Sequence, residues 1–293
     1  MAQELLVISG KGGTGKTSVV GAFAALAEHK VLADCDVDAA DLHLLLSPKV
    51  REAHDFSASK EALIHGEHCI GCERCIAVCR FDALSMVDGV AIVDPIACEG
   101  CGVCAHICPE GAITMEDVIS GNWYLSETKY GPMVHAELGI AQENSGKLVA
   151  LVRREAKKLA QRAGCKYVII DGPPGIGCPV ISAIAQVDLA LIVSEPTAAG
   201  IHDLERVLAL ADHFGVETAA AINKYDLDLA RTDQIEEYCR GRGTPVVGKI
   251  PFDEAVVKAV VEGVPLMAYD PDGQAAQEMR TMWMNVVEYL DAL

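Results

Sequence analysis

Apolar and polar residues alternate in two patterns along most of the chain. Short apolar runs bounded by glycine or by a carboxylate indicate buried strands. These runs lie at residues 4–9, 30–34, 167–171, 189–193, 219–222 and 246–250. Between them, apolar residues recur at helical spacing, first in Thr17–Glu28. The alternation predicts an α/β fold with a mostly parallel, doubly wound sheet, helices on both faces and ligands at the carboxyl ends of the strands.

Two long helical patterns differ in the environment that we expect for their side chains. The last one, Gln274–Leu293, places five apolar side chains on one face, which we expect in the core: Met279, Met282, Trp283, Val286 and Leu290. A membrane-surface helix is disfavoured there, because Arg280 is its only basic residue. The other pattern begins at Asn144 or Ser145 and stops at Gly164. We expect its basic residues on an exposed face: Arg153, Arg154, Lys157 and Lys158.

The strand and helix pattern breaks between about residues 55 and 118, where eight of the twelve cysteines lie. This stretch repeats itself after 29 residues, because CIGCERCIAVCRFDALSM aligns with CEGCGVCAHICPEGAITM. Two copies of a small, cysteine-rich unit predict an inserted module. We therefore expect a domain at 59–118 between the two parts of a larger one, at 1–58 and 119–293.

The balance of charges limits the partners. The chain has 42 acidic and 24 basic residues, a net charge of −18, which argues against nucleic acid or anionic lipid and favours a basic protein partner. It contains no run of 18 apolar residues and no signal-peptide pattern, so we expect a cytoplasmic protein without membrane insertion. In that compartment cysteines are metal ligands more often than disulfide partners.

Residues 10–17, GKGGTGKT, match the G-x-x-x-x-G-K-[ST] pattern of a phosphate-binding loop, with a strand before it and a helix after it. Glycines let backbone N–H groups surround phosphate oxygens, and the helix N-terminus adds positive potential. Lys16 would neutralise the β- and γ-phosphates, and the Thr17 hydroxyl would bind Mg²⁺. The expected nucleotide-binding residues here are Gly10, Lys11, Gly12, Gly13, Thr14, Gly15, Lys16, Thr17 and Ser18.

A second lysine, Lys11, gives the loop the deviant Walker A form KGGTGKT. In this it resembles the MinD/ParA/nitrogenase iron protein family of P-loop ATPases, over about residues 1–50 and 120–293. The resemblance implies a homodimer with nucleotide at its interface, in which Lys11 reaches the partner's phosphates. By position, Asp36 would orient the attacking water and Asp171 would hold Mg²⁺ through water. The implied catalytic residues are Lys11, Lys16, Asp36 and Asp171, and the implied magnesium residues are Thr17, Asp36 and Asp171.

A second motif bears on the base of the nucleotide. Asn223–Asp226, NKYD, literally fits the N-x-x-D signature that reads guanine in GTPases. The resembled family instead uses the Asn and the backbone near a later proline to read adenine, and Pro251–Asp253 fits that arrangement. We therefore expect ATP, bound by Asn223, Lys224 and Pro251, with GTP as the alternative. Asp226 would then be a capping residue of the next helix.

The spacing C-x2-C-x2-C-x3-C occurs twice within 40 residues, from Cys69 and from Cys98. It is the spacing of a two-cluster ferredoxin, so the insertion resembles a small α+β ferredoxin-like domain with two [4Fe–4S] clusters. In such domains the fourth cysteine of each run binds the other cluster. The implied sets are Cys69, Cys72, Cys75 and Cys108 for the first cluster and Cys79, Cys98, Cys101 and Cys104 for the second.

Other interpretations of the cysteines stay open. Two structural zinc sites are the alternative, although zinc sites seldom use this spacing. The isolated cysteines are expected to be small buried residues: Cys35, Cys165, Cys178 and Cys239. For Cys178 the alternative is a metal shared with a dimer mate. His65 and His68, beside the first ligand, are expected to be solvated.

Together these features predict an ATPase, with ATP and Mg²⁺, whose nucleotide state is coupled to electron transfer through two [4Fe–4S] clusters to a redox protein partner. The insertion closely follows Asp36, so a change on γ-phosphate binding would act on it through about residues 39–48. One alternative is an iron–sulfur carrier or assembly ATPase, for which only Cys178–Pro179 of a C-P-x-C motif is present. Another is a MinD-like spatial organiser with a redox-sensing module.

Overall fold

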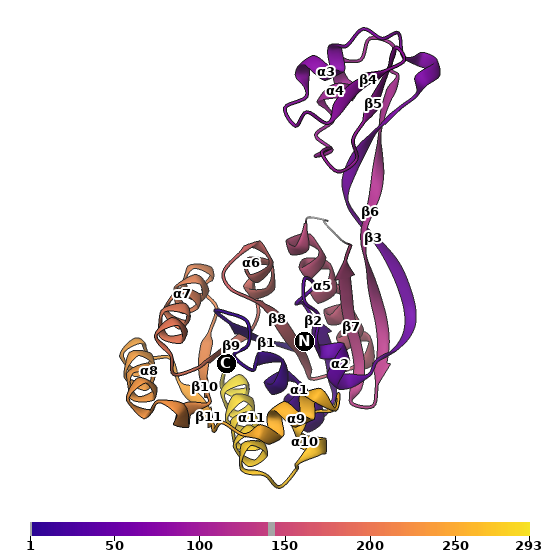
Figure 1. Cartoon of the computed structure of the whole chain (residues 1–293). Helices are drawn as coiled ribbons and strands as arrows, with labels where there is room; N and C mark the ends of the chain where they lie inside the picture. Colours follow the sequence, from indigo (N-terminus) through magenta and orange to yellow (C-terminus); the bar gives the residue numbers. More distant parts are fainter. Residues whose placement is uncertain (1, 140–143) are drawn as a thin grey trace. The chain divides into compact units, whose positions relative to one another are not determined.

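The chain divides into two compact units (Figure 1), and the computed structural model describes residues 2–139 and 144–293. Unit 1 comprises the chain up to His54, Trp123–Leu138 and Ser145–Leu293. Unit 2 comprises Asp55–Asn122 together with Gly139 and Asn144. All eight cysteines of the two C-x2-C-x2-C-x3-C runs lie in unit 2.

Unit 1 is organised by a sheet with the strand order β11-β10-β9-β1-β8-β2-β7-β6-β3. The strands are β1 (Gln3–Ser9), β2 (Lys30–Asp34), β3 (Lys49–Ile64), β6 (Ile113–Thr128), β7 (Gly131–Leu138), β8 (Tyr167–Pro174), β9 (Leu189–Ser194), β10 (Thr218–Asn223) and β11 (Val246–Ile250). Pairing is parallel from β11 through β9, β1, β8 and β2 to β7. The predicted mostly parallel α/β sheet is therefore confirmed.

Helices cover both faces of this sheet, which explains why its strands read as continuous apolar runs. Against one face pack α1 (Lys16–Leu26), α2 (Leu42–Leu46), α9 (Glu254–Val261), α10 (Leu266–Tyr269) and α11 (Gln274–Ala292). On the other side lie α5 (Ser145–Ala163), α6 (Cys178–Ile184), α7 (Ala198–Phe214) and α8 (Leu229–Arg242). The short η2 (Tyr225–Leu227) links β10 to α8.

The last helix, α11, lies in the core as predicted. All five apolar residues expected on its inner face are buried, and Trp283 packs with its ring centroid 4.9 Å from that of Phe23 on α1. A helix whose apolar stripe is buried in this way is held by packing rather than by its own propensity. Among the described residues, no helix is both long enough and apolar enough to cross a membrane.

Unit 2 repeats one local arrangement twice. Its elements are η1 (Gly66–His68), α3 (Arg74–Val78), α4 (Val103–Ile107) and the antiparallel pair β4 (Leu84–Val87) and β5 (Val90–Val93). The residue before α3, Glu73, and the residue before α4, Gly102, both have left-handed backbone, with φ of 56° and 75°. The repeat seen in the sequence is therefore also a repeat in conformation.

Three strands at one side of the sheet, β3, β6 and β7, were not predicted. Both β3 and β6 cross the boundary between the units, at His54–Asp55 and at Asn122–Trp123. The expected connection through about residues 39–48 is wrong, because that segment belongs to unit 1 and contains α2. The two units are joined by these strands instead.

Candidate functional site

The glycine-rich loop connects β1 to α1 at the carboxyl edge of the sheet. Gly13 and Gly15 have positive φ, 79° and 92°, a backbone that other residues rarely adopt. The loop lines a cavity of about 460 Å³, within the range of small-ligand sites. The cavity brings together these predicted residues: Gly12, Gly13, Thr14, Gly15, Lys16, Thr17, Ser18 and Asp36.

Asn223 braces the loop from the end of β10. Its side-chain Nδ2 donates to the Thr14 carbonyl at 2.7 Å, and a Cβ on Gly15 would collide with the same amide. The next residue, Lys224, donates from Nζ to the Gly13 carbonyl at 3.3 Å. Asn223 and Lys224 contact the loop but, like the buried Pro251, are not among the residues that line the cavity.

Lys16 lies between two of the predicted carboxylates. Its Nζ is 2.6 Å from Asp171 Oδ1 and 3.4 Å from Asp36 Oδ2, and its side chain is almost fully buried. Burial alone would lower the pKa of Lys16, but Asp171 and Asp36 outweigh it and raise the pKa. A cation held so firmly in its charged form is suited to bind phosphate.

Asp34, two residues before Asp36, has no role in the sequence prediction. It is fully buried at the end of β2, in register with Asp171 on β8. Its carboxylate accepts hydrogen bonds from the backbone N–H of Asp36, at 3.1 Å, and of Leu42, at 3.3 Å. Burial, and then the neighbouring Asp171, raise the pKa of Asp34 well above its ordinary value. Asp34 thus fixes the loop that carries Asp36.

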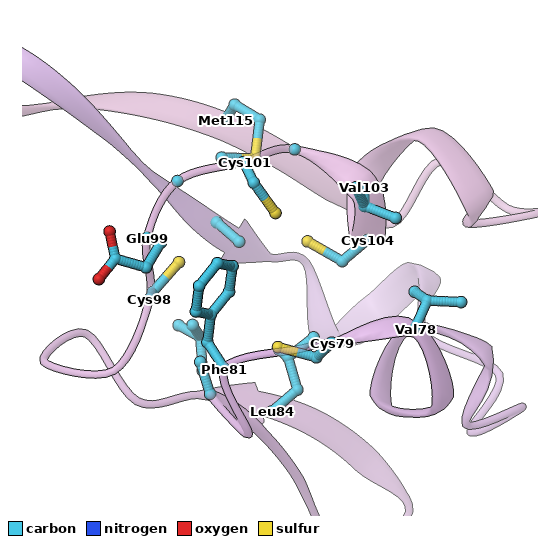
Figure 2. A pocket seen from close by; sticks show the side chains of 15 residues that line it. Val78, Cys79, Phe81, Leu84, Cys98, Glu99, Cys101, Val103, Cys104 and Met115 are labelled. Carbon is cyan, nitrogen blue, oxygen red and sulfur yellow. The ribbon is translucent and has the colours of Figure 1, made fainter.

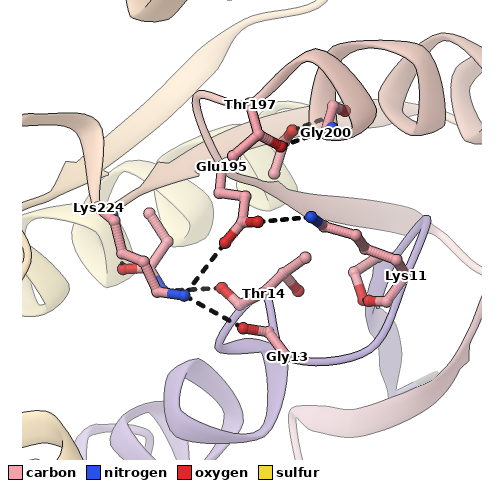
Figure 3. A network of polar contacts seen from close by, with 10 residues as sticks. Lys11, Gly13, Thr14, Glu195, Thr197, Gly200 and Lys224 are labelled. Atoms are coloured by element: carbon pink, nitrogen blue, oxygen red, sulfur yellow. Dashed lines mark hydrogen bonds and ion pairs between the residues drawn. The ribbon is translucent and has the colours of Figure 1, made fainter. Parts of the chain in front are cut away.

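The predicted trans-acting lysine, Lys11, has a partner within its own chain. Its Nζ lies 2.6 Å from Oε1 of Glu195, the residue that follows β9 (Figure 3). The other oxygen, Oε2, lies 3.1 Å from Lys224 Nζ. Although burial opposes it, these two lysines lower the pKa of Glu195. Sequence reasoning missed this network because its members come from three distant segments.

The role expected for Asp226 was wrong. Its Oδ1 accepts from the backbone N–H of Phe252 at 2.7 Å, and α8 is capped by Asp228, whose side chain accepts from Arg231 N. Asp226 therefore ties the NKYD loop to the Pro251–Asp253 segment. This link holds together the two segments that the sequence assigned to base recognition.

The two predicted cysteine sets line two separate cavities in unit 2. Cys79, Cys98, Cys101 and Cys104 line one, with apolar neighbours such as Phe81 and Leu84 (Figure 2). The other is lined by Cys69, Cys72, Cys75 and Cys108. Figure 2 shows side chains of the first set directed toward a common space. The structure therefore brings together each group of four that the spacing implied.

The cysteines of unit 2 differ in the pKa of their thiols. All twelve cysteines are free thiols, and backbone N–H groups of Ala91 and Gly71 lower the pKa of Cys69. Burial raises the pKa of Cys75 and of Cys104. Among the described residues, no three or more His, Cys, Asp or Glu side chains are grouped as they would be around one metal ion. In a cube each cysteine binds a different iron, so its four sulfurs need not converge on one point.

Two expectations about other side chains need correction. Cys35 and Cys239 are buried, but Cys165 is half-buried and Cys178 is exposed. Arg153 does not lie on an exposed face: it donates to the carbonyls of Ser182 and Ala185 at the end of α6. It also pairs with the buried Glu4 at 3.1 Å. Arg153 therefore anchors α6, the helix that follows the loop after Asp171.

Comparison with known proteins gives this arrangement a family. The model of the CobQ/CobB/MinD/ParA nucleotide binding domain matches residues 5–266. The chain belongs to this family. It is accordingly classed as a P-loop ATPase, with the loop and the parallel sheet described above as the shared elements.

Individual relatives cover different shares of the chain. An uncharacterized protein of Methanocaldococcus jannaschii, MJ0578, is 32% identical over 98% of this chain and 97% of its own length. The septum site-determining protein MinD of Helicobacter pylori is 28% identical over 45% of this chain and 54% of its own. The solved structure of MinD with Mg-ADP from Pyrococcus horikoshii covers 99% of this chain and 97% of its own, with a TM-score of 0.62 and 18% identity. At that identity the likeness shows the fold.

Proposed function

We propose that this protein is an ATP-dependent redox ATPase, in which nucleotide binding by a homodimer is coupled to electron transfer through two [4Fe–4S] clusters in unit 2. Bound clusters would act as one-electron carriers, and the ATPase domain would provide a conformational change. A redox protein would be the partner at unit 2. The proposal rests on the family, on the nucleotide loop and on the cysteine cavities.

The observation that carries the redox part is the composition of the two cavities. Each is lined by the first three cysteines of one run and the fourth of the other, Cys108 or Cys79. This crossed arrangement is the one that two-cluster ferredoxins use. The surrounding apolar side chains, among them Ala62 and Ile113, would shield a cluster from water and so affect its potential. The donor set therefore fits two cubes better than two zinc ions, which need four converging thiolates each.

The ATPase part follows from the contacts of the loop. Lys16 would exchange Asp171 and Asp36 for the β- and γ-phosphates, which frees both carboxylates. Asp171 and the Thr17 hydroxyl would then hold Mg²⁺, and Asp36 would orient the attacking water. Lys11 would act on the phosphates of the partner subunit. The excess of negative charge on phosphate over a carboxylate provides the driving force for this exchange.

ATP is the proposed nucleotide. Asp226, which a guanine-reading site would need for the base, is occupied by the N–H of Phe252 at 2.7 Å. The backbone at Pro251 remains as the base-reading element, with Asn223 and Lys224 beside the loop. A direct competition between ATP and GTP for the purified protein tests this choice: ATP should bind at least tenfold more tightly.

A redox titration tests the coupling. Protein purified without oxygen would be titrated by cluster EPR with and without Mg²⁺ and a non-hydrolysable ATP analogue. A shift near or above ~59 mV means a tenfold change in the one-electron reduction equilibrium, and the proposal expects at least that. The matched control is Lys16→Gln, which should keep both clusters and lose the shift.

The outcomes are distinct. Two clusters without any shift would contradict coupling while leaving the cluster assignment intact. Protein that binds zinc and no iron would contradict the redox function altogether. Transfer of iron to an apo-acceptor protein on ATP addition would favour the carrier function instead.

The MinD relatives support a second candidate, spatial organisation, because the similarity to the Helicobacter pylori protein spans 145 residues. ATP-dependent co-sedimentation with lipid vesicles would test it. The proposed redox ATPase expects no nucleotide-dependent change in that assay.

A further inference from the structure

Glu195 is a half-buried counter-ion that pairs with two lysines at once. Its side chain is 13% exposed, and its two oxygens lie 2.6 Å from Lys11 Nζ and 3.1 Å from Lys224 Nζ (Figure 3). Lys11 itself is about one-third exposed, at the start of the loop. The contact therefore joins a more accessible cation to a less accessible anion.

The backbone around Glu195 holds the carboxylate in place. The Thr197 side chain caps α7 by accepting from Gly200 N, and a Cβ on Gly200 would collide with the Glu195 carbonyl. Ser194, just before it, donates from its hydroxyl to the Gly200 carbonyl at 3.0 Å. Because this turn is tightly packed, Glu195 stays in place when Lys11 moves.

Lys224 makes such a movement of Lys11 feasible. It pairs with Glu195 and also donates to the Gly13 carbonyl, so it is anchored to the loop independently of Lys11. When Lys11 leaves, Glu195 still has one cation beside it. A half-buried carboxylate left without any partner would lose solvation without compensation, and the second lysine prevents this.

We propose that Glu195 is a positioning residue that holds Lys11 within its own subunit until ATP-driven association. Lys11 then exchanges Glu195 for the phosphates of the nucleotide in the partner subunit. This inference rests on the proposed dimeric function. Glu195 competes with phosphate for the same cation, so it sets how much nucleotide and protein are needed for association.

Glu195 should have a measurable but moderate effect on association of the subunits, because its pair with Lys11 is partly exposed. Pairs of this kind change equilibria by up to about fivefold. In Glu195→Gln the charge is removed and the shape is kept, so Lys11 is released. We expect the dimer dissociation constant, measured by sedimentation with Mg²⁺ and a non-hydrolysable ATP analogue, to fall about three- to fivefold. The affinity of the monomer for ADP should change less than twofold.

Two further variants make the test specific. Glu205→Gln removes the same charge from the exposed surface of α7 and should leave association unchanged. Glu195→Gln should give no gain when it is added to Lys11→Met. An unchanged dissociation constant in Glu195→Gln, or an equal gain in Glu205→Gln, would overturn the inference. Normal association of Lys11→Met would instead refute the proposed trans role of Lys11, which is a separate failure.

Discussion

Cys79 and Cys108, the last cysteines of two consecutive runs, each line the cavity formed by the first three cysteines of the other run. The two cavities therefore depend on one another for a complete set of four. A chain folded in this way links each half of the repeat to the other. The pairing has consequences that single substitutions can measure.

If the cavities hold two clusters, Cys108→Ser should remove the same cluster as Cys69→Ser, although the two positions belong to different runs. Each variant should lose about half of the iron and show the same residual EPR spectrum. Cys79→Ser should match Cys98→Ser in the same manner. Cys178→Ser, at an exposed position in unit 1, is the control and should retain all the iron. Matching spectra within each run would show that the sets are not crossed.

A pair of glycines tests the shape of one cavity. Gly100 lies between two ligands of the second set with φ of 63°, and a Cβ there would collide with the Lys60 carbonyl. Gly111 has nearly the same φ, 61°, and open space around it. Alanine at either position strains the backbone by about 1–2 kcal/mol. A difference between the two variants therefore reports the collision with Lys60 alone. Gly100→Ala should lose the cluster of Cys98 and its set, and Gly111→Ala should keep both clusters. Equal iron contents would contradict this.

The buried pair of Lys16 and Asp171 should affect the free energy of unfolding. Asp171→Asn leaves a buried lysine with Asp36, at 3.4 Å, as its remaining ion pair, so the nucleotide-free protein should lose about 3–5 kcal/mol. Phosphate can replace the missing carboxylate, so ADP should stabilise this variant more than the wild type. Chemical denaturation with and without ADP measures both effects. Asp36→Asn, which removes the longer contact, should cost less.

His135 predicts a pH dependence of stability. It is buried on β7, its Nε2 lies 2.9 Å from Ser126 Oγ, and burial followed by the nearby His43 lowers its pKa to about 4. The unfolded chain has an ordinary histidine pKa of about 6.5, so it binds the proton first as the pH falls. The contribution of His135 to the free energy of unfolding is complete above about pH 6.5. It falls by about 3 kcal/mol as the pH decreases to about 4.

Denaturation at a series of pH values checks this expectation. The loss between pH 6.5 and 4 should be smaller in His135→Gln, because its amide keeps a hydrogen-bonding group and cannot titrate. Exposed His202 provides the control, and His202→Gln should follow the wild type. Parallel curves for all three proteins would show that His135 is not responsible.

The strands at the centre of the sheet could be predicted because they are buried on both faces. In β9, for example, every residue is buried, so the sequence reads as one apolar run. β3 and β6 were missed because most of their side chains are at least partly exposed, which removes the alternation that identifies a strand. The pattern of apolar residues along a sequence reflects burial, and few residues of these two strands are buried.

The candidate site shows the same limit. The phosphate-binding loop is contiguous, so its spacing alone identifies it, and the cysteine sets follow from a repeat. The contacts of Glu195 and of Arg153 join segments that are far apart in the chain. Helical spacing placed Arg153 on an exposed face, because it could not show that the end of α6 would cover this residue. Asp226 likewise fits a sequence motif, but its contact in the structure is with Phe252, which lies 26 residues further on.

β3 and β6 run antiparallel as neighbours, with Asn122 Nδ2 bonded to Asp55 Oδ1 at 3.1 Å and His65 N bonded to Ala112 O at 2.8 Å. The chain thus leaves the nucleotide-binding unit and returns to it on adjacent strands. An Asn-Gly turn joining Asp55 to Asn122 would close them into an ordinary hairpin. The cysteine-bearing unit is in this sense a cassette: one insertion into a hairpin turn would add it to an ATPase lineage, and one excision would remove it.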